Sequence, residues 1–243
     1  MDSQVLRDDM VDSLEHEAKA VLRTEALGLA MRTVPREYFL DEGQAPHADR
    51  PYRVDGTTAF APSTVARLFE ALDLHSNEKV LLVGAGVGYT AAIAAELVGS
   101  EHVHAIDLAS GIVHVARRNL AASGYDEVLV AQGDGANGLA AYAPYDRILL
   151  EVSAVRPPHQ LLAQLRSDGR LVMPMGSGRP ELVAIEDGDV VDRRGPLAAP
   201  PMLVSGEEAG AIERNRMHRE DRERAQLAAE RRRGWEAEWI DWD

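Results

Sequence analysis

Three glycines with the spacing G-x-G-x-G separate a short apolar run from a helix-forming segment. They are Gly84, Gly86 and Gly88, and Tyr89 follows them directly. Glycine lets the backbone turn sharply and approach a ligand, because no Cβ atom stands in the way. The first turn of the following helix presents unpaired N–H groups to the same place. We therefore expect Gly84, Ala85, Gly86 and Gly88 to contact a ligand, with a purely topological turn as the alternative.

The spacing of these glycines and the next acid narrow the class of ligand. A dinucleotide site takes G-x-G-x-x-G, and Tyr89 stands where its third glycine would be. The tighter pattern is typical of domains that bind S-adenosylmethionine. Asp107 ends the next expected strand with Leu108 beside it, and its carboxylate can accept hydrogen bonds from ribose hydroxyls. The ribose of a nicotinamide cofactor would suit Asp107 equally well. The alternative role of Asp107 is to cap the helix that begins at Ser110.

A further carboxylate follows the third strand, in Gly133-Asp134-Gly135. A carboxylate accepts hydrogen bonds, so at that edge it can hold the amino group of an adenine ring. Aspartate and glycine also favour ordinary turns, and a plain turn is the alternative. Together with the glycine loop and Asp107, we expect Asp134 and Gly135 to complete the contacts of one nucleoside.

Strands and helices alternate around these loops. By periodicity we expect strands over 79–83, 102–106, 127–131, 147–152 and 170–174, and helices over 89–98, 110–123 and 158–166. Asp187-Gly188-Asp189 predicts a hairpin between 182–185 and 190–192. Such alternation favours an α/β fold with a mostly parallel, doubly wound, Rossmann-like sheet. Ligands bind such sheets beyond the carboxyl ends of the strands.

The flanking segments extend this domain at both ends. We expect one helix over 3–33, ended by Pro35, then an ordered loop over 41–62 and a helix over 62–72. Residues 207–233 hold seven acids and eight arginines and predict a long solvated helix. One domain is therefore expected over 1–205, including the N-terminal helical region, with a charged helical extension over 206–243. Trp235, Trp239 and Trp242 in this extension either dock onto the domain or bind a partner.

Composition excludes several classes of function. The formal net charge of −14 argues against nucleic acid as a partner. The chain has no cysteine, no apolar run of membrane-spanning length and no signal-like start, so we expect a cytoplasmic protein with no membrane association. His102 and His104 share one expected strand face but lack a third ligand, so no metal is expected. Neither a G-x-S-x-G elbow nor a P-loop is present.

Several ordered motifs between residues 20 and 205 resemble the protein-L-isoaspartate O-methyltransferase family. Val34–Phe39 is similar to its VPRE-x-F element, and Val80–Tyr89 to its VLEIGTGSGY loop. The remaining matches are Asp49–Tyr52, Gly133–Gly135, Ala143–Asp146, Gln164-Leu165, Asp168–Val172 and Pro174–Gly176. The resemblance implies S-adenosylmethionine as cofactor and damaged, isoaspartyl-containing proteins or peptides as substrates. It also implies an acceptor groove formed by Thr57–Pro62 and the segment near Met202–Ser205.

Two positions depart from the family pattern. Phe60 stands where the family has a serine beside the transferred methyl group, and Leu82 stands where it has an acid. Phe60 and Thr58 are our candidate catalytic residues: Phe60 could pack against the methyl group, and Thr58 or Ser63 could replace the lost hydroxyl. Two alternatives therefore stay open. One is a methyltransferase of the same fold with another substrate, and the other is an inactive cofactor-binding interaction protein.

The charge composition predicts a dependence on salt. Only Lys19 and Lys79 are lysines among 26 basic residues, and the chain is strongly acidic. If the protein comes from a salt-rich cytoplasm, molar KCl will screen its self-repulsion and raise the free energy of unfolding. A urea titration at increasing KCl measures this. Full stability without salt would contradict the hypothesis and favour the alternative, an ordinary acidic protein from a genome rich in arginine codons.

Overall fold

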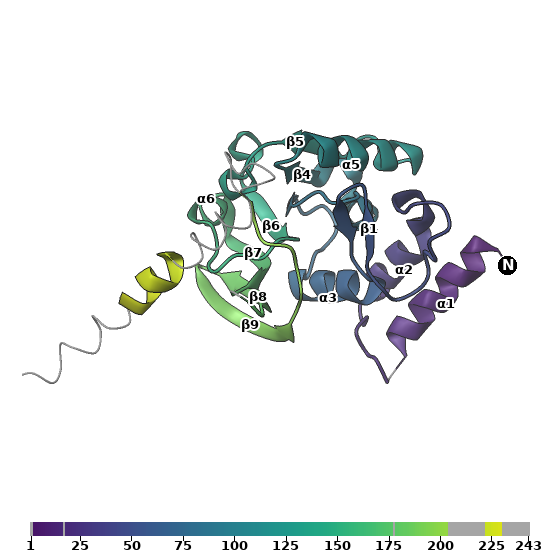
Figure 1. Ribbon diagram of the computed structural model, residues 1–243, viewed down its shortest axis with the longest axis horizontal. Helices are drawn as coiled ribbons and strands as arrows, with labels where there is room; N and C mark the ends of the chain where they lie inside the picture. Colours follow the sequence, from purple (N-terminus) through teal and green to yellow (C-terminus); the bar gives the residue numbers. More distant parts are fainter. Residues whose placement is uncertain (1, 17, 177, 204–221, 230–243) are drawn as a thin grey trace, which may run out of the picture.

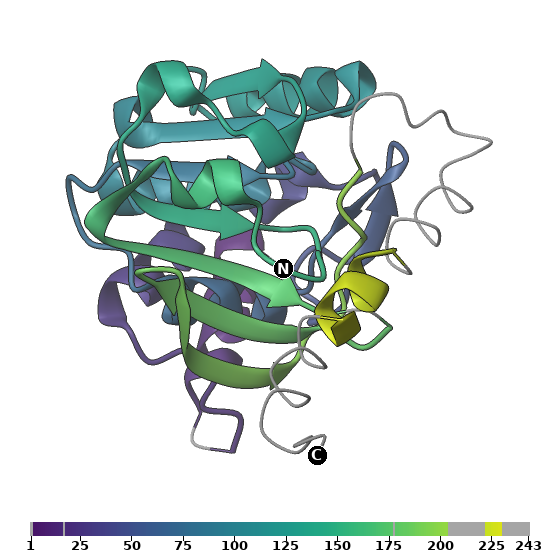
Figure 2. The same cartoon turned by 90° about the vertical axis from the view of Figure 1, so that its left-hand side faces the viewer.

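A twisted seven-stranded sheet forms the centre of the protein. The computed structural model describes residues 2–16, 18–176, 178–203 and 222–229. The strand order is β5-β4-β3-β6-β7-β8-β9, in which β3 to β7 are parallel and β8 and β9 join as antiparallel neighbours. Figure 2 shows the green strands β7 to β9 at one end of the sheet and the teal strands at the other. The strands are β3 Val80–Val83, β4 Val103–Asp107, β5 Leu129–Gln132, β6 Tyr145–Leu150, β7 Leu165–Met175, β8 Glu181–Glu186 and β9 Asp189–Pro196.

Helices cover the two faces of the sheet unequally. Alternate residues of a strand point to opposite faces, so Leu82 belongs to one buried cluster while Leu81 and Val83 belong to the other. The first cluster packs under helices α3 Pro62–Leu72, α4 Tyr89–Val98 and α5 Ser110–Ala122. The second packs under the short helix α6 His159–Leu162 and the 3-10 turns before β6. Crossovers on both faces confirm the expected doubly wound α/β fold (Figure 1).

The expected single helix over 3–33 is wrong, because the chain reverses within it. Helix α1 covers Ser3–Glu15 and α2 covers Glu25–Thr33. The reversal brings the Leu22 amide back to donate to the Leu14 carbonyl at 3.3 Å. The two helices then pack closely at Gly28, where a Cβ atom would lie 2.6 Å from Glu15 Oε1. Two short helices can both bury their apolar sides, which one straight helix of this length could not do.

The segment over 41–62, expected to be an ordered loop, contains a β-hairpin. Strand β1, Tyr52–Val54, pairs with β2, Thr57–Ala59, in antiparallel register. Asp55 and Gly56 form the turn, with φ angles of 47° and 86°. Aspartate-glycine is a favoured pair for such two-residue turns. Strands of three residues are too short to show an alternating pattern, so the expectation of a loop without strands was wrong.

Two other expectations need smaller corrections, and a third is confirmed. Helix α6 ends at Leu162 rather than at 166, because the chain extends at Leu165 to pair with Tyr145. His102 lies in a 3-10 turn, so it does not share a strand face with His104. The β8–β9 hairpin is confirmed, and Asp187 and Gly188 turn it with positive φ angles.

The end of the chain is described only in part. Residues 222–229 are helical, as expected for part of the charged extension. The boundary at 205/206 and the three tryptophans lie outside the described residues. No helix in the described ranges is both long and apolar enough to cross a bilayer.

Arg36 connects the N-terminal region to the rest of the domain. It lies in the 3-10 turn η1, Arg36–Phe39, and its side chain is 1% exposed. The guanidinium donates to the carbonyls of Pro46 and Phe60, the latter at 2.7 Å. It also lies 5.6 Å from the centroid of the Tyr89 ring, within the range of a cation–π interaction. One buried cation thus joins η1, the 41–51 loop, the β1–β2 hairpin and the start of α4.

Replacing Arg36 tests this arrangement. Arg36→Met keeps most of the side-chain volume but leaves two inward-facing carbonyls without their donor. We expect the free energy of unfolding to fall by roughly 2–4 kcal/mol. Urea denaturation measures the change, and Arg53→Met on the exposed side of the same hairpin is the matched control. Equal losses in the two variants would show that the buried contacts of Arg36 are not what stabilises this region.

Candidate cofactor-binding site

The predicted ligand residues meet at one edge of the sheet. The glycine loop follows β3, Asp107 ends β4, and Asp134 follows β5. These three strands are neighbours and parallel, so their carboxyl ends lie together. The chain crosses over in opposite senses after β3 and after β6, which makes their junction the topological switch point of the sheet. Ligands of such folds bind in the crevice at that point.

The glycine loop is shaped by positions where side chains do not fit. Gly84, Gly86 and Gly88 have φ angles of 94°, 51° and 91°, in the left-handed region that glycine adopts most readily. A Cβ atom on Gly86 would lie 3.3 Å from Glu151 Oε2 and 3.9 Å from the carbonyl oxygen of Thr58. The loop is therefore a narrow backbone cradle between the end of β6 and the β1–β2 hairpin.

Asp107 holds the glycine loop from the neighbouring strand. Its Oδ2 accepts from the amide of Ala85 at 3.1 Å, and its Oδ1 accepts from the amide of Ala109 at 3.1 Å. Burial raises the pKa of Asp107, and these N–H donors oppose the rise. The amide of Ala109 is that of the N-cap residue of α5, so the alternative role of Asp107 at the start of this helix stays open beside contact with a ligand. Each carboxylate oxygen has a second lone pair that can accept from a ligand.

Asp134 and Gly135 approach the same loop from the other side of β4. The Asp134 side chain accepts from the amide of Ala136 at 2.9 Å and begins a 3-10 turn. A Cβ atom on Gly135 would lie 2.6 Å from Val83 Cγ1, so only glycine lets this turn lie against the end of β3. Asp134 therefore forms the expected turn, and the turn leaves the expected contact with a ligand possible. Contact with an adenine ring stays a prediction.

A further carboxylate in this site was not among the predicted residues. Glu151 follows β6 directly and is 7% exposed. Burial raises the pKa of Glu151 to about 7; the side chain of Thr90 lowers it through a hydrogen bond, and the charge of Asp107 raises it. The sequence holds the signal, because an acid directly follows an apolar run at the end of a strand, as Asp107 does.

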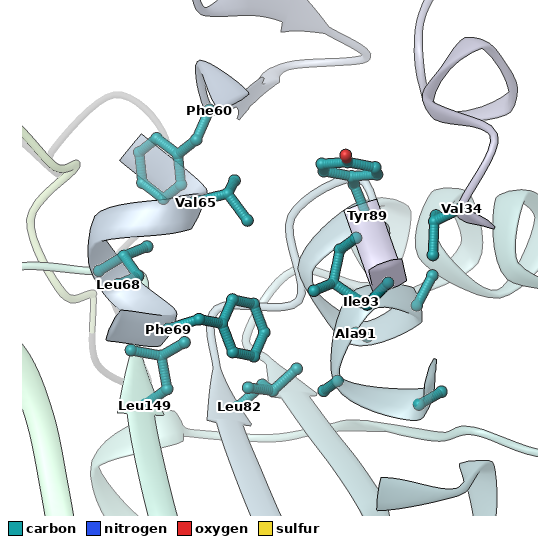
Figure 3. Close-up of a cluster of buried hydrophobic side chains, with 14 of the residues drawn as sticks. Val34, Phe60, Val65, Leu68, Phe69, Leu82, Tyr89, Ala91, Ile93 and Leu149 are labelled. Carbon is teal, nitrogen blue, oxygen red and sulfur yellow. The ribbon is translucent and has the colours of Figure 1, made fainter. Parts of the chain in front are cut away.

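The two departures from the family pattern lie on the α3–α4 side of the sheet. Leu82 is 1% exposed and packs among apolar side chains that include Phe69 and Leu149 (Figure 3). Phe60 is 8% exposed, and its ring lies by Val65 (Figure 3). The ring of Phe60 is thus part of the core, while the Thr58 carbonyl faces the glycine loop.

Of the two segments expected to form the acceptor groove, one lines a cavity, and the groove itself stays a prediction. A cavity of about 530 Å³ opens beyond the ends of β6 and β7, and Met202 lines it. Residues 57–62 do not line this cavity, and Ser205 lies outside the described residues. The full lining consists of Ala136, Ser153, Ala154, Val155, Arg156, Pro157, Pro158, His159, Leu162, Gly176, Pro201, Met202 and Glu223.

The described histidines and acids do not gather into a metal site. In that part of the chain, no group of three or more His, Asp or Glu side chains is placed to hold an ion. His104 instead lies 3.0 Å from the Tyr145 hydroxyl through Nδ1, inside the domain. Burial lowers the pKa of His104, which favours its neutral form.

The residues present fit a nucleoside that carries a positive charge. The cradle at Gly86 accepts backbone contact but no side chain, and three carboxylates, Asp107, Asp134 and Glu151, lie at the ends of three strands. Two of them, Asp107 and Glu151, have a pKa raised by burial. A cationic ligand would relieve that unfavourable burial of negative charge.

Removing the Asp107 carboxylate tests the cradle. Asp107→Ala removes the acceptors of the Ala85 amide in the glycine loop and of the Ala109 amide before α5, and with them the expected partner of the ribose hydroxyls. We expect the Kd for S-adenosylhomocysteine to rise about 10- to 100-fold, as for the loss of charged hydrogen bonds. Isothermal titration calorimetry measures the Kd. Asp126→Ala, on the exposed segment before β5, is the control, and an unchanged Kd for Asp107→Ala would place the ligand elsewhere.

Comparison with known proteins agrees with this geometry. Residues 6–192 match the family model of protein-L-isoaspartate(D-aspartate) O-methyltransferase. The chain is 39% identical over 182 residues to the protein-L-isoaspartate O-methyltransferase of Methanothermobacter thermautotrophicus, covering 72% of this chain and 84% of the relative. It is 36% identical over 212 residues to that of Thermococcus onnurineus, covering 83% of this chain and 95% of the relative.

Solved structures show the same architecture. A protein-L-isoaspartate O-methyltransferase superposes with a TM-score of 0.71 at 25% identity, covering 87% of this chain and 69% of that one. A candidate enzyme of the same kind from Plasmodium falciparum, solved with S-adenosyl-L-homocysteine, also gives 0.71, at 18% identity, covering 81% and 98%. The second likeness concerns the fold alone. By the extent of the family match and these identities, the chain belongs to the protein-L-isoaspartate(D-aspartate) O-methyltransferase family.

Proposed function

We propose that this protein is an S-adenosylmethionine-dependent methyltransferase that methylates the free carboxylate of isoaspartyl residues in damaged proteins. The observation that carries the proposal is the backbone cradle at Gly84–Gly88, with Asp107 bonded to it, in a chain of this family. Relatives named for this activity match most of the chain at 36–39% identity. The net charge of −14 is consistent with protein substrates rather than nucleic acid, and we infer a cytoplasmic location.

We assign the cofactor to the residues that line the cradle. The backbone of Gly84, Ala85, Gly86 and Gly88 would lie against its amino-acid end. Asp107, with Leu108 beside it, would accept from the ribose hydroxyls. Asp134 and Gly135 would border the adenine ring. When bound, S-adenosylmethionine supplies a methyl group that is electrophilic because it is attached to a positively charged sulfur.

The acceptor needs no general base from the protein. An isoaspartyl carboxylate has an ordinary pKa of about 4, so it is already an anionic nucleophile at neutral pH. The contribution of the chain is to hold the acceptor in line and to exclude water, which in favourable cases supplies about 7–11 kcal/mol. The hairpin beside the glycine loop is placed for this role, since the Thr58 carbonyl faces Gly86. Thr58, half-buried, and Phe60, buried, are the residues we assign to the acceptor side.

Phe60 keeps a second candidate function open. A buried phenyl ring at this position cannot donate the hydrogen bond that a serine hydroxyl would donate to an acceptor. The same fold could therefore serve a methyl acceptor other than isoaspartate. A non-catalytic role, with the charged extension binding a partner, is the remaining alternative.

Methyl transfer from labelled S-adenosylmethionine tests the proposal. The acceptor is an isoaspartyl peptide, the matching aspartyl peptide is the control, and both are assayed at low and at molar KCl. We expect base-labile label on the isoaspartyl peptide alone, since methyl esters hydrolyse in base. No transfer to either peptide, with cofactor binding confirmed by calorimetry, would contradict isoaspartyl methylation and favour another substrate or a non-catalytic role.

The variant Phe60→Ser separates those outcomes further. If the wild-type protein is active, Phe60 is tolerated and the variant shows activity of the same order. If only Phe60→Ser is active, the native chain has lost isoaspartyl methylation while keeping the fold and the cofactor site.

A further inference from the structure

A buried carboxylate lies directly beneath the glycine loop, at Glu151. Its backbone amide donates to the Val83 carbonyl at 2.9 Å, which fixes the residue beside the end of β3. Its Oε2 lies 3.3 Å from the position that a Cβ on Gly86 would take. Glu151 is 7% exposed. The carboxylate therefore points at the place where the backbone cradle receives its ligand.

The position of Glu151 on the sheet explains this direction. Leu149 of β6 pairs with Leu82 of β3, and both side chains lie in the cluster beneath α3 and α4. Because side chains alternate along an extended chain, Glu151 points to the same face as Leu149, two residues nearer the ligand edge. Thr90, in the first turn of α4, donates a hydrogen bond to it there. The carboxylate thus lies between the sheet edge and the N-terminus of α4.

The charge of Glu151 lacks a cationic partner in the described part of the chain. The charged group that acts on it is Asp107, at the end of β4, and this is another acid. No arginine, lysine or histidine among the described residues forms an ion pair with Glu151. A buried carboxylate beside a second one is unfavourable unless a cation or several donors arrive. The site is therefore arranged for a positively charged ligand group.

We propose that Glu151 is the counter-ion of the ammonium group at the amino-acid end of S-adenosylmethionine. This rests on the proposed function, because it needs that cofactor. S-adenosylmethionine carries two positive groups, the ammonium and the sulfonium. Only the ammonium has N–H groups that a carboxylate can accept. A carboxylate placed against the sulfonium would also be a competing methyl acceptor in an enzyme that methylates carboxylates.

The proposal predicts how binding depends on pH. Without ligand, burial raises the pKa of Glu151 to about 7, with the Thr90 hydroxyl of α4 lowering it and Asp107 of β4 raising it. An ammonium partner favours the ionised carboxylate, so ligand binding below pH 7 must release a proton. The affinity for S-adenosylhomocysteine, which carries the same ammonium, should therefore rise by about tenfold from pH 6 to pH 8 and then level off.

Two ligands and one isosteric variant test the assignment by calorimetry. S-adenosylhomocysteine has the ammonium, and 5′-deoxy-5′-methylthioadenosine has the same nucleoside and sulfur without the amino-acid end. In Glu151→Gln we expect the Kd for S-adenosylhomocysteine to rise about 10- to 100-fold and its pH dependence to disappear. The Kd for methylthioadenosine should stay unchanged. Glu127→Gln, exposed before β5, is the matched control and should behave as wild type.

The other outcomes would overturn the assignment in distinct ways. An equal loss of affinity for both ligands in Glu151→Gln would mean that Glu151 only supports the fold of the loop. An unchanged affinity for both would mean that Glu151 does not contact the ligand. A loss for S-adenosylmethionine but not for S-adenosylhomocysteine would place Glu151 at the sulfonium. If the wild-type protein binds none of them, the cofactor assignment itself fails. Thermal unfolding without ligand at pH 8 is the folding control, and Glu151→Gln should melt at or above the wild-type temperature because it removes a buried charge.

Discussion

The 41–51 loop and the β1–β2 hairpin beside the ligand site are held in place by one buried cation, Arg36. Carbonyl groups of the 41–51 loop and of the hairpin segment at Phe60 face inward, where water cannot satisfy them. The guanidinium donates to both and stacks near the Tyr89 ring at the start of α4. Burial lowers the pKa of Arg36, which shows the cost of keeping this charge inside, and the bonds offset that cost. The hairpin is thereby held against the glycine loop rather than left free in solvent.

The edge of the sheet where we expect the ligand carries negative charge, in contrast to the positive charge of Arg36. Asp107 ends β4 and Glu151 follows β6, the two strands that flank β3, and burial raises the pKa of both carboxyl groups. Such uncompensated burial reduces the stability of the free protein and is typical of functional sites. The arrangement suits a small ligand that brings its own positive charge. It also explains how a site can keep a carboxylate near the loop although Leu82 is apolar, because Glu151 lies on the same face of the sheet.

Local sequence patterns were enough to predict the glycine loop and Asp107, but not the β1–β2 hairpin beside them. Gly84, Gly86, Gly88 and Asp107 follow strands whose apolar runs are short, continuous and clearly bounded, so the loop and its acid could be placed from the sequence. The hairpin around Asp55-Gly56 was missed because its strands have three residues each. The break between α1 and α2 was missed because apolar residues continue through it, and the reversal of the chain at the Leu22–Leu14 hydrogen bond becomes evident only in the folded structure.

The alternation of strands and helices from β3 onward, the glycine loop, Asp107 and Asp134 follow from the chain alone, because they depend on neighbours within a few residues. The neighbours of Glu151, the apolar surroundings of Leu82 and the burial of Phe60 depend on the pairing of β3 with β6 and on the docking of the hairpin. These contacts join residues some sixty positions apart, as Lys79 and Asp146 illustrate with a separation of 67. Sequence spacing does not encode such distances, so the full set of charges around the ligand became apparent only once the sheet was assembled.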